Sequence, residues 1–320
     1  MKIVGVDLHA KQQSIAMLDN QTGELTERVI RHEGNAVREF YAALEGPVVV
    51  GLEATGSMQW FLELLTANRF PDIWMPSIEQ RDLRTRLRDR HQWVKMGARL
   101  QHTLQSIALN HALRKGTSLW TAAGLETLQR LPLPPYTRQR RNQLLSLYAE
   151  LQKRIQELDR QVEEQAQQRP QARRLLTHPG VGPVTALATE VFLGDPSRFA
   201  KGKNVASYIG MIPCEHTSGK RQRLGKLTKE GNSLLRYLWT EATIHAVRKD
   251  PELKRFYRRK LIQKGMGKAR IAAAHKLGIR LWIMLRDQID YKEFCRRGQQ
   301  RQCGEAHAGM PNYNSGPALQ

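Results

Sequence analysis

The chain of 320 residues carries 51 lysines and arginines against 30 aspartates and glutamates, which gives a net charge of +21 and an isoelectric point near 10.3. A charge of this size favours a polyanionic partner such as nucleic acid. No apolar run approaches the roughly 20 residues that span a bilayer, and no basic amphipathic anchor or lipidation signal is evident, so the sequence argues against a membrane protein.

The first part of the chain predicts a small sheet. Apolar and β-branched residues favour strands at residues 3–6, 12–18, 25–30 and 47–52. Apolar side chains at helical spacing predict a helix over residues 35–45, and a second helix begins at Trp60. We therefore expect a first domain of the α/β class over residues 1–110.

Two long helices follow, and the first is very basic. Between residues 78 and 109, an apolar stripe that includes Leu83 and Leu87 lies among arginines and lysines. A proline-rich break precedes the second helix, in which leucine, isoleucine and valine recur at three- and four-residue steps over residues 144–162. This pattern predicts a helical arm over residues 111–170, whose apolar stripe either pairs in a coiled coil or packs on a neighbouring helix.

The last part of the chain predicts a compact, mostly helical domain over residues 171–288, interrupted by glycine-rich turns. Residues 289–320 are polar and rich in glycine, and we expect them to form a disordered tail. We therefore predict an α/β domain, a helical arm and a helical domain, in that order.

The cysteines and the amino terminus indicate the cellular compartment. Cys214, Cys295 and Cys303 show neither metal-ligand nor disulfide spacing, which is typical of free thiols in a reducing cytoplasm. The residues directly after Met1 are strand-like and do not form a signal peptide. We expect a cytoplasmic protein that is associated with the nucleoid.

Two carboxylates stand at predicted strand ends. Asp7 closes the first strand and Glu53 closes the fourth. Acids at the ends of adjacent strands can hold Mg²⁺, which prefers oxygen ligands, and two such ions stabilise the attacking and leaving oxygens of phosphoryl transfer. Taken alone, the pair fits equally well with ordinary polar residues that end strands.

Two short motifs surround these acids: residues 4–9, Val-Gly-Val-Asp-Leu-His, and residues 51–56, Gly-Leu-Glu-Ala-Thr-Gly. They resemble the N-terminal half of the IS-one-ten family of insertion-sequence transposases, which includes relatives of the Piv invertase and the bridge-RNA-guided recombinases. The resemblance implies a RuvC-like, RNase H-like domain with four metal-binding acids, of which Asp7 and Glu53 match two. The family segment Lys-Thr-Asp-x-x-Asp-Ala, which supplies the other two, has no match, so we expect this domain to be truncated near residue 67.

A Pro-Gly-Val-Gly-Pro turn within residues 176–186 resembles a helix-hairpin-helix. Gly180 and Gly182 permit a tight turn, and the helix that follows presents unpaired N–H groups that can bind a phosphate without reading its sequence. The alternative is an ordinary turn between helices. The net charge of the chain favours the nucleic-acid interpretation.

Residues 199–238 resemble the C-terminal serine transposase domain of the same family, through the Gly210-Met211-Ile212-Pro213 turn and the Ser218-Gly219 step. In that domain the serine at this position attacks DNA, which assigns the role of nucleophile to Ser218. Basic residues that could neutralise a phosphate crowd the same stretch: Lys220, Arg221, Arg223, Lys226 and Lys229. Without the resemblance, Ser218 would be interpreted as a turn residue; His216 is either an acid or base, or a phosphate ligand.

The resemblance implies a transposase that moves its own element through a covalent serine–DNA intermediate, with Mg²⁺ as its metal. It also implies a structured non-coding RNA that pairs with donor and target DNA, and a homo-oligomer in which acids of one subunit and the serine of another share a site. Two alternatives stay open. One is a nucleic-acid-binding remnant, because half of the acidic set is missing, and the other is a metal-dependent RuvC-type nuclease that does not use the serine.

Overall fold

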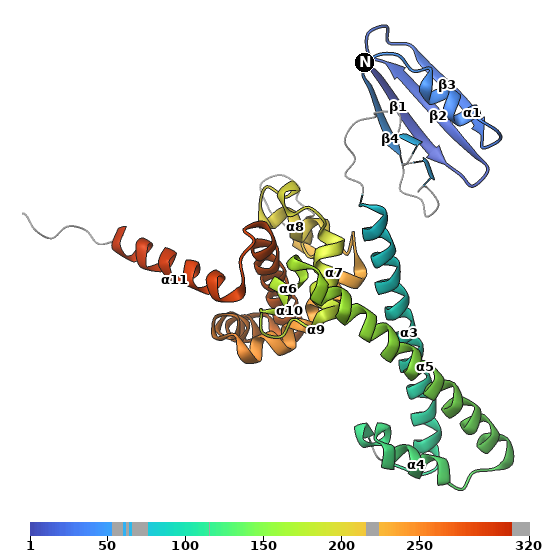
Figure 1. Cartoon of the computed structure of the whole chain (residues 1–320), viewed down its shortest axis with the longest axis vertical. Helices are drawn as coiled ribbons and strands as arrows, with labels where there is room; N and C mark the ends of the chain where they lie inside the picture. Colours follow the sequence, from blue (N-terminus) through green and yellow to red (C-terminus); the bar gives the residue numbers. More distant parts are fainter. Residues whose placement is uncertain (53–59, 62–63, 66–75, 115, 216–223, 309–320) are drawn as a thin grey trace, which may run out of the picture. The chain divides into compact units, whose positions relative to one another are not determined.

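The computed structural model describes residues 1–52, 60–61, 64–65, 76–114, 116–215 and 224–308. The chain divides into two units, Met1–Met75 and Pro76–Gln320 (Figure 1). Each unit has its own hydrophobic core. The mixed α/β class predicted from the sequence is confirmed, with strands dominant in the first unit and helices in the second. Within the described ranges, no helix has the length and apolarity that a membrane crossing requires.

The first unit contains a four-stranded sheet with the order β3-β2-β1-β4. Strands β1 (Lys2–Leu8), β2 (Gln12–Asp19) and β3 (Leu25–Arg31) form an antiparallel meander, and β4 (Val48–Leu52) pairs with β1 in parallel. Helix α1 (Ala36–Ala42) supplies the crossover that a parallel neighbour needs. The predicted strands and first helix are confirmed, while the RNase H-like identity of this unit stays a prediction.

Side chains alternate across this sheet and give it one buried and one open face. On the buried face, Val4 and Val6 of β1 pack with Ile15 of β2 and with Tyr41 of α1. The open face carries large apolar side chains that remain exposed, namely Ile3, Leu25, Val29 and Val49. The first unit therefore has a core on only one side of its sheet among the described residues.

The second unit begins with an antiparallel helix pair. Helix α3 (Ile78–Asn110) starts with a capping box between Ser77 and Gln80, and α5 (Pro135–Gln168) starts with a proline in its first turn. Arg86 donates to Gln161 at 2.9 Å, and Gln101 donates to the hydroxyl of Tyr148 at 2.8 Å, so the two helices run in opposite directions. The apolar stripe of the predicted arm thus packs on a neighbouring helix of the same chain.

The far end of this arm is closed by two short elements. The 3-10 helix η1 (Gly116–Trp120) and helix α4 (Ala122–Arg130) connect α3 to α5 and pack with them in a small separate core. Figure 1 shows the arm extending away from the remaining helices of the unit, with α4 at its tip.

The remaining helices surround α7 (Pro183–Leu193), which is buried from Thr185 onward. Around it lie α6 (Pro170–Leu176), η2 (Pro196–Arg198), α8 (Gly202–Tyr208), α9 (Ser233–Lys249) and α10 (Pro251–Arg286). Trp239 of α9 donates its indole N–H to Thr189 of α7 at 2.9 Å and lies against Gly278 of α10. The mostly helical structure predicted for residues 171–288 is therefore confirmed.

The boundary between the two units differs from the sequence prediction. We expected the first domain to reach residue 110, but α3 lies in the second unit and packs on α5 and α7. The reason is visible in Arg84 of α3, whose guanidinium donates to the carbonyl oxygens of Val191 and Phe192 at the end of α7. These hydrogen bonds join α3 to the helical body.

The expected disordered tail also differs, because a helix, α11 (Tyr291–Ala308), covers much of it. Asp290 accepts a hydrogen bond from the backbone N–H of Glu293 at 2.8 Å, which caps the helix start. Glu293 then pairs with Arg296 and Arg297 at helical spacing. Residues 309–320 lie outside the described residues.

We expect Gly278→Ala to lower the free energy of unfolding of the second unit by about 1–3 kcal/mol, because overpacking a tight helix contact forces side chains out of place. A Cβ at this position would lie 1.8 Å from Cζ3 of Trp239. Gly267→Ala in the same helix is the matched control, since its Cβ would meet nothing within 4 Å. It should raise stability by up to about 1 kcal/mol through helix propensity. Urea unfolding measures the stability of both variants. Equal changes in the two variants would contradict the close contact between Gly278 and Trp239.

Candidate functional site

The acidic strand end of the first unit is only partly described. Asp7 alternates with the buried Val6 and Leu8 and lies on the open face of the sheet, with its side chain 57% exposed. Its carboxylate Oδ2 lies 3.1 Å from Nε2 of His9. Leu52, the last residue of β4, pairs in parallel register with Val6, so the carboxyl ends of both strands meet at one edge of the sheet. Glu53 lies outside the described residues.

The metal that the resemblance implies can be tested against these residues. Within the described part of the chain, no group of three or more histidine, cysteine, aspartate or glutamate side chains could hold a metal ion. Among the residues that the structure describes, His9 is the one ionisable hydrogen-bond partner of Asp7. The described residues alone therefore do not fit a resident Mg²⁺ ion, which prefers a nearly complete octahedron of oxygen ligands.

The glycine turn at residues 177–182 is tightly packed between α6 and α7. Gly180 has a left-handed φ of 87°, and a Cβ there would lie 2.3 Å from the backbone nitrogen of Ala246 in α9. Only glycine satisfies both constraints. Gly182 is the exposed N-cap of α7, and Pro183 follows in its first turn. The turn between helices is thus confirmed, and its binding of phosphate stays a prediction.

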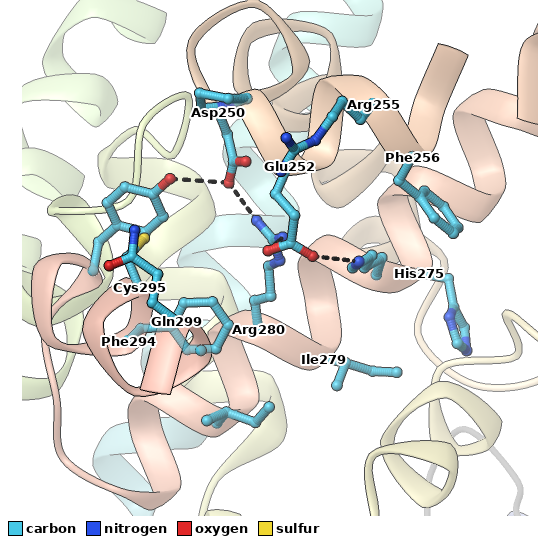
Figure 2. Close-up of a pocket in the computed structure, with 15 residues that line it drawn as sticks. Asp250, Glu252, Arg255, Phe256, His275, Ile279, Arg280, Phe294, Cys295 and Gln299 are labelled. Carbon is cyan, nitrogen blue, oxygen red and sulfur yellow. Dashed lines mark hydrogen bonds and ion pairs between the residues drawn. The ribbon is translucent and has the colours of Figure 1, made fainter. Parts of the chain in front are cut away.

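A buried charged cluster lies under this turn. His178, a residue only 1% exposed, donates from Nδ1 to the carbonyl of Pro179 at 3.0 Å, and its Nε2 lies 4.0 Å from Oδ2 of Asp250. Asp250 also accepts hydrogen bonds from the Tyr291 hydroxyl at 3.0 Å and from the backbone N–H of Leu253, and it forms an ion pair with Arg280 (Figure 2). The cluster joins the turn to α11 and to both ends of α10.

The surroundings determine the protonation states in this cluster. Burial lowers the pKa of His178 to about 4, and the nearby Arg280 guanidinium acts in the same direction. Burial alone would raise the pKa of Asp250, but the Leu253 N–H, the Arg280 charge and the Tyr291 hydroxyl outweigh it, so that pKa is lowered. At neutral pH the cluster therefore holds a neutral histidine beside an ionised aspartate.

The serine segment is flanked by a two-stranded ribbon. Strands β5 (Pro213–Glu215) and β6 (Leu224–Leu227) are antiparallel, and Glu215 pairs with Leu224. The segment between them, residues 216–223, lies outside the described residues. It contains four of the predicted site residues and the alternative acid or base: Ser218, Lys220, Arg221, Arg223 and His216.

Two predicted basic residues, Lys226 and Lys229, are described, and both are exposed. Lys229 adopts a left-handed φ of 56°, which is uncommon for a residue with a side chain, and its N–H donates to the carbonyl of Gly210 at 3.2 Å. Backbone strain of this kind is often found at functional sites.

Arg236 holds the residues around Lys229 in place through hydrogen bonds to the backbone. Its Nη1 donates to the carbonyl oxygens of Ile209 at 2.7 Å and Glu230 at 2.8 Å. One guanidinium thus links the end of α8 to the residues that follow β6. This structural role of Arg236 could not be predicted from the sequence, because backbone carbonyl acceptors do not depend on residue type.

Part of the second unit is similar to a family of known proteins. Residues 172–258 match the model of the Transposase IS116/IS110/IS902 family. This match contains the glycine turn and the serine segment, but neither Asp7 nor Glu53. Residues 172–258 are therefore similar to this transposase family, as the sequence motifs indicate.

Curated proteins that are similar to this chain are also described as transposases. A probable family 20 transposase from Pseudomonas aeruginosa is 30% identical over 188 residues, which is 57% of this chain and 55% of the relative. The transposase for insertion sequence element IS1111A from Coxiella burnetii is 27% identical over 230 residues, or 68% of this chain and 62% of the relative. The transposase for element IS1328 from Yersinia enterocolitica is 30% identical over 106 residues, about a third of each protein (33% and 32%). The chain thus spans less than two thirds of the length of these relatives.

We expect the second unit to lose stability as the pH falls from about 6.5 to about 4, by on the order of 3 kcal/mol, because neutral His178 must take up a proton that the unfolded chain binds more readily. Because the pKa of His178 is lower in the folded chain than in the unfolded chain, the unfolded chain binds the proton more strongly, and protonation lowers the stability of the fold. Urea unfolding at pH 7 and pH 4.5 measures the change.

His178→Gln should make the stability of the second unit less dependent on pH, although the loss of packed side-chain atoms lowers that stability at every pH. The exposed His245→Gln in α9 is the matched control and should leave the dependence unchanged. An equally steep pH dependence in His178→Gln would contradict the role of His178.

Proposed function

We propose that this chain, a relative of IS116/IS110/IS902 transposases, is a DNA transposase whose nucleophile is Ser218. The observation that carries the proposal is the match of residues 172–258 to that family, because the match contains the Ser-Gly step. Two exposed lysines, Lys226 and Lys229, follow the segment within 11 residues of the serine in sequence. They supply positive charge where a DNA phosphate would have to bind.

The proposed reaction is a transesterification. The hydroxyl oxygen of Ser218 attacks a backbone phosphorus, a serine–phosphate bond forms, and the bond from phosphorus to one deoxyribose oxygen breaks. The serine proton is lost to a base or water, and the leaving deoxyribose oxygen gains a proton. A deoxyribose hydroxyl of the incoming strand later reverses the step, so the phosphoester bonds are conserved. The lysines and arginines of the segment would stabilise the charge on the phosphate oxygens.

The partners follow from the same proposal. The net charge of +21 suits both DNA and a structured RNA, and an RNA that pairs with donor and target DNA would leave backbone recognition to the protein. A homo-oligomer would bring Asp7 and Glu53 of one subunit to Ser218 of another. These partners rest on the resemblance.

A second candidate function is that of a nucleic-acid-binding remnant with impaired chemistry. The observation that favours it is the lack of a Lys-Thr-Asp-x-x-Asp-Ala segment in the sequence, which leaves Asp7 and Glu53 without the two further acids of the family. Two carboxylates offer Mg²⁺ little geometric control, and a pair of ions would have no evident seat.

We expect Ser218→Ala to abolish a covalent protein–DNA adduct while leaving DNA affinity within about twofold, because one hydroxyl contributes little to a charge-dominated interface. The assay is denaturing gel electrophoresis after incubation with a labelled duplex that carries the element end and, if required, the RNA. Ser207→Ala is the matched control, since Ser207 is an exposed serine in α8. An adduct of equal yield in Ser218→Ala would rule out this serine.

We expect recombination in cells to rise roughly tenfold or more when the Lys-Thr-Asp-x-x-Asp-Ala segment is inserted near residue 67, because a two-ion site requires ligands that the present acids do not provide. The same insertion with both aspartates replaced by asparagine controls for the added length. Equal and efficient recombination by the unaltered chain would show that the segment is dispensable.

A further inference from the structure

Helix α10 is folded back on itself at Gly265. The backbone there has φ 76° and ψ 170°, which is not helical, and residues on either side are helical. Lys276 pairs with Glu252 at 2.7 Å, and its ammonium lies 5.0 Å from the ring centre of Phe256. These contacts place the end of α10 beside its beginning, so the helix is a hairpin whose tip is formed by residues 258–268. We call this segment the α10 tip.

The positive charge on this hairpin is uneven. Residues 253–286 contain eleven lysines and arginines and not one acid. Three cations of the hairpin have acidic partners: Lys276 with Glu252, Arg280 with Asp250, and Arg270 with Glu241. The cations of the tip, by contrast, form no ion pair with any residue that the structure describes: Arg258, Arg259, Lys260, Lys264 and Lys268. The tip is therefore an unneutralised cationic surface.

Large apolar side chains stand among these cations. Ile262 is 88% exposed and Met266 is 72% exposed, and Leu261 is also exposed. Ile262 and Met266 lie on either side of the Gly265 bend. The contacts that hold the two halves of the hairpin together involve Lys276, Glu252 and Phe256, and neither Ile262 nor Met266 takes part in them. An apolar point inside a cationic rim is typical of a binding surface.

We propose that the α10 tip inserts into the minor groove of duplex DNA, with Ile262 and Met266 as an apolar wedge against a base step and the surrounding lysines and arginines on the flanking phosphates. Minor-groove proteins use isoleucine, leucine and methionine in this way and kink the duplex. The minor groove of double-stranded RNA is wide and shallow and would not enclose such a wedge. This placement rests on the proposed function as a DNA transposase and adds a DNA contact outside its serine segment.

The test uses the full chain and a duplex of about 30 base pairs with fluorophores at its ends, so that energy transfer reports bending and anisotropy reports affinity. We expect the unaltered protein to raise energy transfer. Ile262→Ser/Met266→Ser should abolish that rise and weaken binding about three- to tenfold, because the kink is lost while phosphate contacts remain. Both side chains are exposed, so circular dichroism should be unchanged.

The charges of the tip have a separate readout. Lys264→Gln/Lys268→Gln should make the slope of log affinity against log salt shallower by roughly 0.9 for each phosphate contact removed. The matched controls are on the arm: Leu147→Ser, an exposed leucine of α5, and Lys153→Gln. Both controls should bend and bind DNA like the unaltered protein.

The outcomes separate this inference from the proposed function. If the unaltered protein binds no duplex at low salt, both fail. If it binds and bends DNA and the tip variants do so equally, only the role of the α10 tip is overturned. Loss of affinity for a structured RNA, or for anionic phosphatidylserine vesicles, with DNA bending intact, would overturn it as well and assign the tip to that ligand.

Discussion

One buried carboxylate connects distant segments of the second unit. Asp250 caps α10 through the Leu253 N–H, pairs with Arg280 thirty residues later, and accepts the Tyr291 hydroxyl at the start of α11. A buried ion pair must be fully hydrogen-bonded to offset the cost of removing two charges from water. Because the partners of Asp250 come from distant segments, that requirement holds the α10 hairpin closed, docks α11 and supports the glycine turn above His178.

The arginines of this chain serve two different purposes. Arg84, Arg236 and Arg280 are tied to carbonyl oxygens or to a buried acid, and they join elements that are far apart in the sequence. Removing Arg84 or Arg280 would leave partly or fully buried acceptors unsatisfied, which costs more than the hydrogen bond itself contributes. The cations of the α10 tip do not join distant elements in this way. A count of basic residues therefore overstates the charge that is available to a polyanion, and the structure identifies which residues provide it.

Local patterns predicted much of this fold. Leu83 and Leu87 mark the buried stripe of α3, and the alternation of Val4 and Val6 with exposed residues marks β1, because both signals depend on neighbours within a few positions. The Asp250–Arg280 pair and the Arg84 clamp on α7 were not predictable, since nothing in the sequence distinguishes these arginines from the others nearby. Helix α11 was not predicted because the segment is polar and lacks an apolar stripe, although Glu293 stands at helical spacing from Arg296 and Arg297. For the candidate site, motif resemblance named Ser218 and Glu53, which lie outside the described residues, while Lys226 and Lys229 are exposed as a phosphate-binding role requires.

The helix pair α3 and α5 gives the second unit a mechanical property. Helix α3 has 33 residues, which at 1.5 Å per residue gives a length of about 50 Å. Its beginning is fastened to α7 by Arg84, and its far end carries only the small core around α4. Such a rod acts as a lever. The 26 residues from Arg84 to Asn110 span about 39 Å, so a rotation of about 10° at the fastened end would carry the tip through about 7 Å, about two base-pair steps of DNA. A small adjustment inside the helical body thus becomes a displacement on the scale of the double helix.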